Sequence, residues 1–187
     1  MVSGKGKIIV ALDVQDEEAA LKLVDRLIPA NPYFKVGLEL YHRTGSYIIE
    51  KIKEKNGQVF LDLKFHDIPN TTAGAARAAV GMGAFMFNFH AAGGRVMLET
   101  AAAAAKEEAE KLNVLPPLLI GVTVLTSFNQ DYLNEIGVTT SVEKQVLALA
   151  QLCYESGLQG VVASPLETAL IRKEFGPEFL IVTPGVR

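Results

Sequence analysis

Short apolar runs rich in β-branched residues alternate along the chain with segments whose apolar residues recur every three or four positions. The apolar runs predict seven strands, at residues 7–12, 33–38, 58–64, 84–90, 118–124, 158–164 and 179–183. The helical segments predict six helices, at residues 16–28, 40–55, 70–82, 94–112, 142–156 and 165–175. Strict alternation of apolar strands with helices is typical of a parallel sheet that helices cover.

Two α/β architectures have this alternation, an open doubly wound sheet and a (β/α)8 TIM barrel. A doubly wound dinucleotide-binding domain needs a glycine-rich turn after its first strand, whereas this turn is Asp13-Val14-Gln15-Asp16. A barrel instead collects its chemistry at the carboxyl ends of its strands. Polar residues stand at most of those ends, namely Asp13, Asp62, Lys64, His90, Thr123, Thr126, Ser164 and Thr183. The sequence therefore predicts the barrel.

The length of the chain fits only part of such a barrel. A complete (β/α)8 barrel takes about 250 residues, whereas this chain has 187 and reaches seven strands. We expect one TIM-barrel domain over residues 1–187, truncated after strand seven and lacking the C-terminal portion with the eighth strand and its helix. The first and seventh strands would then have open edges.

Composition and charge narrow the function classes. The chain has 18 Lys and Arg against 21 Asp and Glu, a net charge of −3, so it lacks the basic excess of a nucleic-acid-coating protein. It has no apolar run of about 18 residues that would predict a membrane span. Its one cysteine, Cys153, excludes a disulfide framework within one chain and a thiolate metal cage. A reducing, cytoplasmic location is expected.

The densest chemical signal is a charged run at the end of the third predicted strand. Asp62 and Lys64 are two residues apart, so both should point into the barrel, and Asp67 follows on the next loop. Lys35 occupies the middle of the neighbouring predicted strand, where a lysine needs a partner, and Asp62 is within reach. We expect Lys35, Asp62 and Lys64 to form a cluster of alternating charges, with Asp67 as a further candidate member.

Residue spacing alone does not decide whether this cluster is a functional site or a structural ion network. It favours a functional site at Asp62 and Lys64, with a structural ion network as the alternative. For Lys35 the two alternatives are evenly balanced, and Asp13 fits either a helix cap or a ligand contact. The histidines form no local metal motif, and Cys153 fits the apolar face of its helix.

Longer motifs around the charged cluster indicate a protein family. Residues 62–71, DLKFHDIPNT, resemble the orotidine 5'-phosphate decarboxylase family, as do ALD at 11–13 and FKVGL at 34–38. HAAGG at 90–94, VTVLTS at 122–127 and TPGVR at 183–187 continue the likeness in order, so that it spans the chain. The Asp-x-Lys-x-x-Asp pattern alone is shared with sugar-phosphate enzymes of the same superfamily. The extension through Ile68-Pro-Asn-Thr71 makes the resemblance specific.

The resemblance implies a cofactor-free decarboxylation of orotidine 5'-monophosphate to UMP in pyrimidine synthesis. It implies that Lys64 stabilises and then protonates a carbanion at C6, and that Asp62 lies beside the departing carboxylate. Lys35 would hold Asp62 and reach the ribose. No metal is implied.

The same resemblance implies a homodimer with shared sites, in which Asp67 and Thr71 are donated by the partner subunit. Asp13 would bind the ribose hydroxyls, Thr126 would face the pyrimidine, and Pro184 would line the base pocket. Arg187 is a further candidate for substrate binding.

One departure from the family bears on binding. The family holds the phosphate mainly with the loop after strand seven and a Gly-Arg at the end of strand eight, and this sequence contains neither. Arg187, the last residue, does not take that role by position, and we expect weak substrate binding by the 187-residue chain. Two alternatives therefore stay open, a metal-dependent sugar-phosphate decarboxylase or synthase of the same superfamily, and a truncated, inactive chain that persists as a dimer or interaction module.

Overall fold

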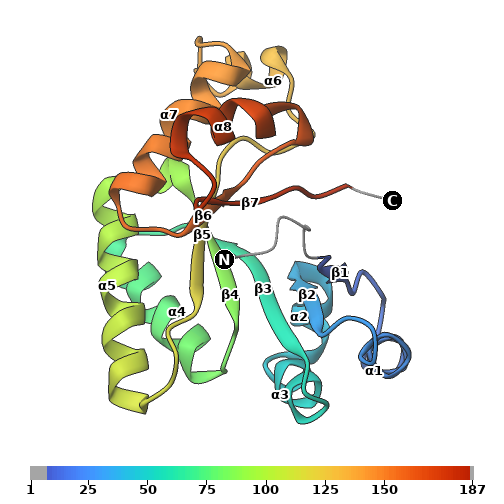
Figure 1. Cartoon of the computed structure of the whole chain (residues 1–187). Coiled ribbons are helices and arrows are strands. Elements are labelled where there is room, and N and C mark those ends of the chain that lie inside the picture. The colour runs from blue at the N-terminus through green and yellow to red at the C-terminus, as the bar shows by residue number, and fades with distance from the viewer. Residues whose placement is uncertain (1–7, 186–187) are drawn as a thin grey trace.

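The computed structural model describes residues 8–185. Its strands form a single sheet in the order β1-β2-β3-β4-β5-β6-β7, and every pair of neighbours is parallel (Figure 1). The strands are β1 (Val10–Ala11), β2 (Tyr33–Gly37), β3 (Gln58–Phe65), β4 (Met86–His90), β5 (Leu118–Val122), β6 (Gly160–Val162) and β7 (Leu180–Val182). This sequential parallel order is that of a (β/α)8 barrel through its seventh strand, as the alternation predicts.

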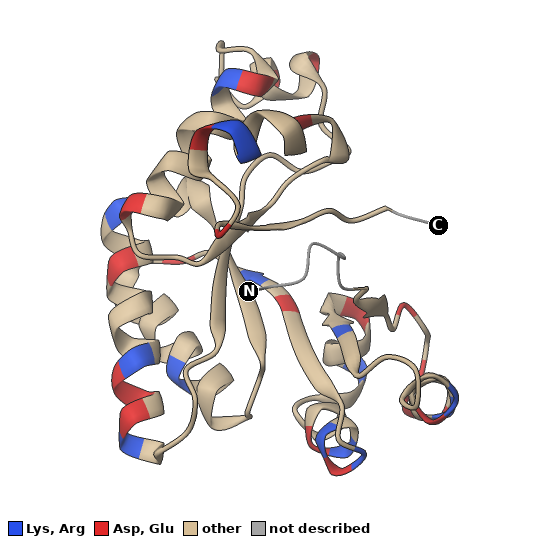
Figure 2. Cartoon of the chain, viewed as in Figure 1, with Lys and Arg blue, Asp and Glu red and all other residues tan. Residues whose placement is uncertain are grey.

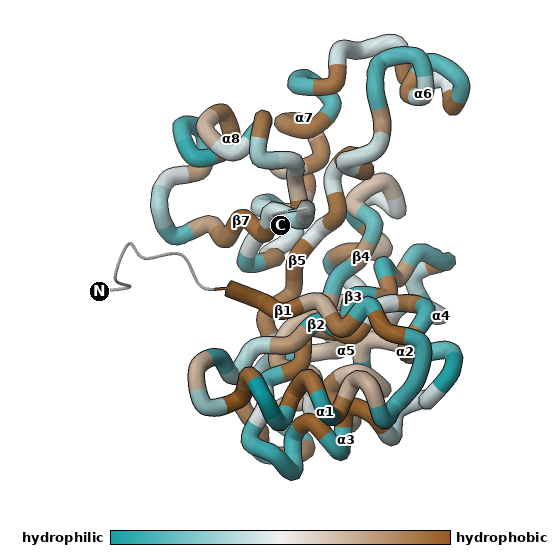
Figure 3. The backbone as a smooth tube through the Cα atoms, turned by 90° about the vertical axis from the view of Figure 1, so that its right-hand side faces the viewer, coloured by the Kyte–Doolittle hydropathy of each residue, from teal (hydrophilic) through white to brown (hydrophobic). Residues whose placement is uncertain are grey.

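Helices follow the strands and pack along the outside of the sheet (Figure 1). They are α1 (Glu17–Leu27), α2 (Leu38–Thr44), α3 (Tyr47–Glu54), α4 (Pro69–Gly81), α5 (Arg95–Leu112), α6 (Gln130–Glu135), α7 (Val142–Glu155) and α8 (Thr168–Phe175), with short 3₁₀ turns η1 (Ala91–Gly93) and η2 (Pro165–Glu167). In α1 and α3, apolar and polar residues alternate around the helix (Figure 3). None of the helices in residues 8–185 is long and apolar enough to cross a membrane.

Three sequence predictions need correction. The single helix expected over 40–55 is two helices, because Gly45 takes a left-handed φ of 63° and ends α2. The helix α6 was not predicted, and Asn129 begins it by accepting a hydrogen bond from the Tyr132 N–H at 3.0 Å. The strand expected over 7–12 is shorter, and Lys7 lies outside the described residues.

The open edges are where the sequence places them. In the described chain, β1 and β7 each pair with one neighbour, β2 and β6 respectively. The β1–β2 ladder is only two residues long and continues as a single bond from the Leu12 N–H to the Lys35 carbonyl at 3.0 Å.

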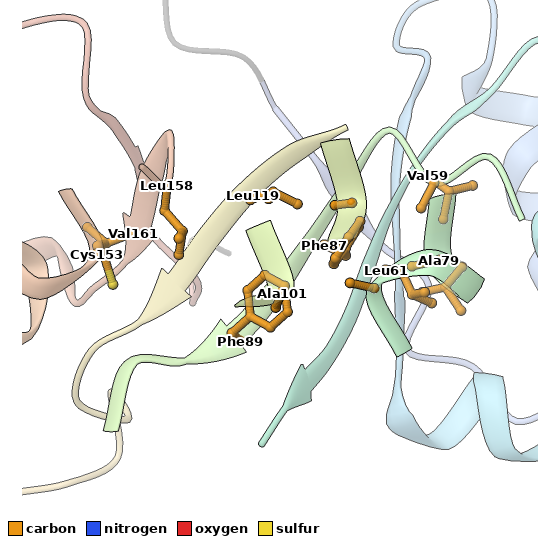
Figure 4. Close-up of a cluster of buried hydrophobic side chains, with 14 of the residues drawn as sticks. Val59, Leu61, Ala79, Phe87, Phe89, Ala101, Leu119, Cys153, Leu158 and Val161 are labelled. Atoms are coloured by element: carbon orange, nitrogen blue, oxygen red, sulfur yellow. The ribbon is translucent and has the colours of Figure 1, made fainter. Parts of the chain in front are cut away.

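The main core lies between the sheet and its helices (Figure 4). Alternate strand residues such as Val59, Leu61, Phe87 and Phe89 are fully buried there. Cys153 of α7 is also in this layer, as predicted, and burial raises the pKa of its thiol to about 12. The thiol is therefore an uncharged core group.

The other strand positions form an inner face that is apolar near the amino ends of the strands and polar toward their carboxyl ends. Near the amino ends, Phe60, Met86 and Ile120 make a separate small apolar cluster. Two residues further along β3 and β4, the inner positions hold Asp62 and Asn88. Charged residues are concentrated on the helices, but β3 itself carries both an acidic and a basic segment (Figure 2). The polar inner face therefore begins directly above an apolar floor.

A glycine controls the approach of the last two strands. Gly160 on β6 is paired with Leu180 on β7, and an added Cβ would lie 2.8 Å from the Leu180 carbonyl carbon. We expect Gly160→Ala to destabilise the protein by about 1–3 kcal/mol, because the strands must move apart. Urea unfolding measures this.

Gly74→Ala is the matched control for that experiment, since Gly74 lies within α4 and an added Cβ meets nothing within 4 Å. It is expected to stabilise the protein by about 0.5–1 kcal/mol. Equal unfolding midpoints for the two variants would contradict the close approach at Gly160.

Candidate active site

Two opposite charges on β3 form the centre of the site. The Lys64 ammonium lies 2.8 Å from Asp62 Oδ1, and both side chains are mostly buried, with 28% and 14% of their surfaces exposed. Strand alternation predicts that they share a face. A carboxylate this far from water needs such a partner, since an uncompensated buried charge is strongly destabilising.

The backbone of β3 is irregular where it carries Lys64. Lys64 has a left-handed φ of 52°, and the pairing of β3 with β4 shifts register between Leu61 and Phe65. The Lys64 N–H is bonded to a side chain, Asn88 Oδ1 on β4, at 2.8 Å. The irregularity at the carboxyl end of a barrel strand is typical of a functional site, where bulges redirect side chains.

A second lysine extends the array toward β1. Lys35 Nζ on β2 lies 3.6 Å from Asp62 Oδ2 and 3.1 Å from Asp13 Oδ1. The ammonium passes over Gly37, where an added Cβ would approach Nζ to 3.1 Å. The result is an alternating array, Asp13, Lys35, Asp62 and Lys64, which sums to zero charge.

The array keeps Asp62 ionised. Burial alone would raise the pKa of Asp62, but hydrogen bonds from Lys64 and Asn88, with the positive charges of Lys64 and Lys35, outweigh it. The pKa of this carboxyl is therefore lowered from its ordinary value. The site holds a fixed negative charge directly beside an ammonium group.

The other residues of the charged run do not join the array within this chain. The Asp67 carboxylate is exposed and accepts the N–H of Ile68, and among residues 8–185 it forms no ion pair. Within the described part of one chain, Asp67 is therefore not part of the charge array. Its carboxylate turns back onto the local backbone just before α4. Thr71 is exposed on the first turn of α4.

The later candidates lie at the same end of the sheet. Thr126 is in the loop after β5 and lines a cavity of about 320 Å³ with Leu125 and Ser164. Pro184 follows β7 and is exposed. Arg187 lies outside the described residues. A larger cavity of about 550 Å³ lies at the amino end of β5, beside Pro117 and Gln159, and no residue of the charge array lines it.

Two of the histidines also meet at the carboxyl ends. The rings of His66 and His90 lie 5.4 Å apart and are tilted by 42°. Burial, followed by the nearby His66 and Lys64, lowers the pKa of His90, so this ring favours its neutral form. His42 is on α2, where its Nδ1 lies 2.7 Å from the Leu38 carbonyl.

Sequence analysis missed Asn88, which hydrogen-bonds both Asp62 and Lys64. The available signal was an asparagine inside an apolar strand, MFNFH. The bond from the Lys64 N–H to Asn88 Oδ1 depends on the left-handed Lys64 backbone, which no feature of the sequence predicts. Within residues 8–185, no three His, Cys, Asp or Glu side chains are grouped as metal ligands would be.

Comparison with known proteins gives one consistent result. The model of the orotidine 5'-phosphate decarboxylase / HUMPS family matches residues 6–187. An orotidine 5'-phosphate decarboxylase of Moorella thermoacetica is 58% identical over 184 residues, which are 98% of this chain and 73% of the relative.

Two solved structures are similar in sequence and in fold. Orotidine 5'-phosphate decarboxylase from Lactobacillus acidophilus has a TM-score of 0.88 and 37% identity, over 97% of this chain and 81% of that one. Orotidine 5'-monophosphate decarboxylase from Methanocaldococcus jannaschii, complexed with the inhibitor BMP, has a TM-score of 0.75 and 28% identity. That match covers 97% of this chain and 78% of the other.

Proposed function

The chain belongs to the orotidine 5'-phosphate decarboxylase / HUMPS family, and on that premise we propose that the charge array at the carboxyl ends of β1–β3 carries out the decarboxylation. The protein is a carbon–carbon lyase that decarboxylates orotidine 5'-monophosphate. The relatives' names favour this activity over the sugar-phosphate branch of the same family. The contact that carries the proposal is the 2.8 Å ion pair between Lys64 and an ionised Asp62.

The chemical step follows from these two charges. The substrate carboxylate is placed against Asp62, and two like charges about 4 Å apart repel by about 4 kcal/mol at an effective dielectric near 20. The bond from C6 to the carboxylate breaks, carbon dioxide leaves, and the electron pair stays on C6. Lys64 Nζ–H⁺ stabilises this pair and then transfers its proton to C6, giving UMP and a neutral amine that water reprotonates.

The remaining members of the array orient the reacting groups. Lys35 contacts Asp13 and Asp62 at once, so it fixes Asp62 while its ammonium faces the ribose side of the site. Asp13 is the most exposed of the four, with 73% of its side-chain surface accessible, and is available to accept ribose hydroxyls. Thr126 and Pro184 lie at the same end of the sheet and are assigned to the pyrimidine.

We assign Asp67 and Thr71 to the site of a partner subunit in a homodimer. Both are exposed at the start of α4, and Asp67 makes no ion pair within the described part of its own chain. Within residues 8–185 only the Ile68 N–H bonds this carboxylate, which leaves it able to meet a lysine across an interface. A cytoplasmic enzyme of nucleotide synthesis fits the single buried thiol.

The proposed function is tested by following loss of the orotate chromophore from orotidine 5'-monophosphate, with and without EDTA. We expect the protein to turn the substrate over at the same rate in both, since Lys64 supplies the positive charge that a metal would otherwise provide. Size-exclusion chromatography with light scattering on the same sample measures the molar mass, which is expected to be that of a dimer.

Two results would contradict the proposal. Activity only on a hexulose or pentulose phosphate, abolished by EDTA, would select the sugar-phosphate branch. A stable dimer without turnover on either substrate would identify a chain that has kept the fold and lost the reaction.

A further inference from the structure

Asn88 is a polar residue in a position that the fold otherwise fills with apolar groups. It lies in the middle of β4, between Phe87 and Phe89, and only 1% of its surface is exposed. Its phenylalanine neighbours face the outer core, so Asn88 faces the interior of the barrel. A buried amide is costly unless both of its ends are bonded, so its contacts explain its presence.

Both ends of this amide are bonded, and each bond goes to the charge array. Asn88 Nδ2 donates to Asp62 Oδ1 at 2.7 Å, and Asn88 Oδ1 accepts from the Lys64 backbone N–H at 2.8 Å. The opposite orientation of the amide would set oxygen against carboxylate and N–H against N–H. The neighbours therefore fix which way the amide points.

The bond to Lys64 supports an unfavourable backbone. A lysine at φ 52° is strained, and the shifted register of β3 gives its N–H the Asn88 side chain as a partner. The ammonium of this same residue lies 2.8 Å from Asp62. Asn88 thus contacts the backbone that aims the ammonium and the carboxylate that the ammonium meets.

We propose that Asn88 is a positioning residue for the decarboxylation, acting through Asp62 and Lys64 and not on the substrate. This inference rests on the roles proposed above for those two residues. The donor end of Asn88 orients Asp62 and favours its ionised form. The acceptor end holds Lys64 in the left-handed conformation that brings its ammonium to the reacting carbon.

The first test is a titration of the Asp62 carboxyl by ¹³C NMR, with the resonance assigned by its loss in Asp62→Asn. Because Asn88 donates to the ionised form, Asn88→Ala should raise the midpoint of Asp62 by about one pH unit. A higher pKa means less ionised Asp62 at acidic pH. The acidic limb of kcat/KM should therefore move up in pH by the same amount.

The second readout is kinetic. A small displacement of catalytic groups costs about 10²-fold in rate, so kcat of Asn88→Ala should fall by about 10- to 100-fold. KM should change less than threefold, because Asn88 touches neither ribose nor phosphate in this assignment. An unchanged kcat together with an unchanged Asp62 midpoint, in a folded Asn88→Ala protein, would overturn the proposal.

Asn88→Asp separates the two ends of the amide. It keeps an oxygen for the Lys64 N–H but sets a second carboxyl against Asp62, so the pair should titrate with one raised midpoint. Its kcat should fall as far as that of Asn88→Ala. A wild-type midpoint in this variant would contradict the assigned donor role, and it provides the test if Asn88→Ala does not fold.

Thr123→Val is the matched control. Thr123, directly after β5, is also buried, and the substitution removes one buried side-chain hydrogen bond, from its hydroxyl to the Val162 carbonyl at 2.9 Å. It should leave the Asp62 midpoint and the acidic limb in place, and a shift equal to that of Asn88→Ala would indicate a general effect of lost packing. The NMR midpoint needs no turnover, so a failure of the proposed function is distinguished from a failure of this inference.

Discussion

Replacing Lys64 with alanine is expected to lower kcat/KM for orotidine 5'-monophosphate by at least about 10⁴-fold. The expectation combines two losses. A positioned general acid contributes about 10²–10⁴-fold, and a preorganised charge at the site of developing negative charge contributes about 10²–10³-fold. Both are assigned to the one ammonium that lies 2.8 Å from Asp62.

Lys64→Arg distinguishes the two losses. Arginine keeps a positive charge beside Asp62 but does not release a proton to carbon, because its guanidinium stays protonated in proteins. We expect it to recover little of the lost rate. Lys106→Ala controls for removal of a lysine, since Lys106 is exposed on α5 and its nearest carboxylate, Glu110, is 4.0 Å away. Activity of Lys64→Ala within tenfold of the unmodified protein would refute the assignment of Lys64.

The second large effect is a loss of stability, expected when a side chain is truncated in the core between the sheet and its helices. Phe87 is fully buried between the sheet and its helices, with ring centroids 5.9 Å from Phe65 and 5.5 Å from Phe89 (Figure 4). Truncating such a ring removes its burial and leaves a cavity in a close-packed core. We expect Phe87→Ala to lower the free energy of unfolding by about 3–5 kcal/mol.

Urea unfolding followed by far-ultraviolet circular dichroism measures this change. Leu115→Ala is the control, because Leu115 is 92% exposed in the loop before β5 and should change stability by less than about 0.5 kcal/mol. A loss below about 1 kcal/mol in Phe87→Ala would mean that the helices close over the vacated space.

The sequence predicted the parts of the fold that depend on local pattern. The order of strands and helices follows from apolar periodicity, and the meeting of Lys35, Asp62 and Lys64 follows from strand alternation and from adjacent strands. The break at Gly45 was missed because the apolar pattern continues across it, and only the backbone conformation separates α2 from α3.

Other features depend on tertiary structure. The left-handed backbone of Lys64 coincides with a shift in the register of β3 against β4, and no local signal predicts it. The role of Asn88 follows from that conformation. Asp67 was a further candidate for the charge cluster because it is close in sequence, but its carboxylate accepts the Ile68 N–H at the turn into α4.

The apolar floor formed by Phe60, Met86 and Ile120 has an electrical consequence. Charges that stand on a poorly polarisable layer are screened weakly from below, so their field lines are directed toward the open, carboxyl end of the strands. The array sums to zero charge, and a distant ion experiences little of it. A group that enters to within a few ångströms instead meets the separate fields of an anion and a cation. The apolar floor and the zero net charge of the array together confine a strong field gradient to the small volume where one bond must break.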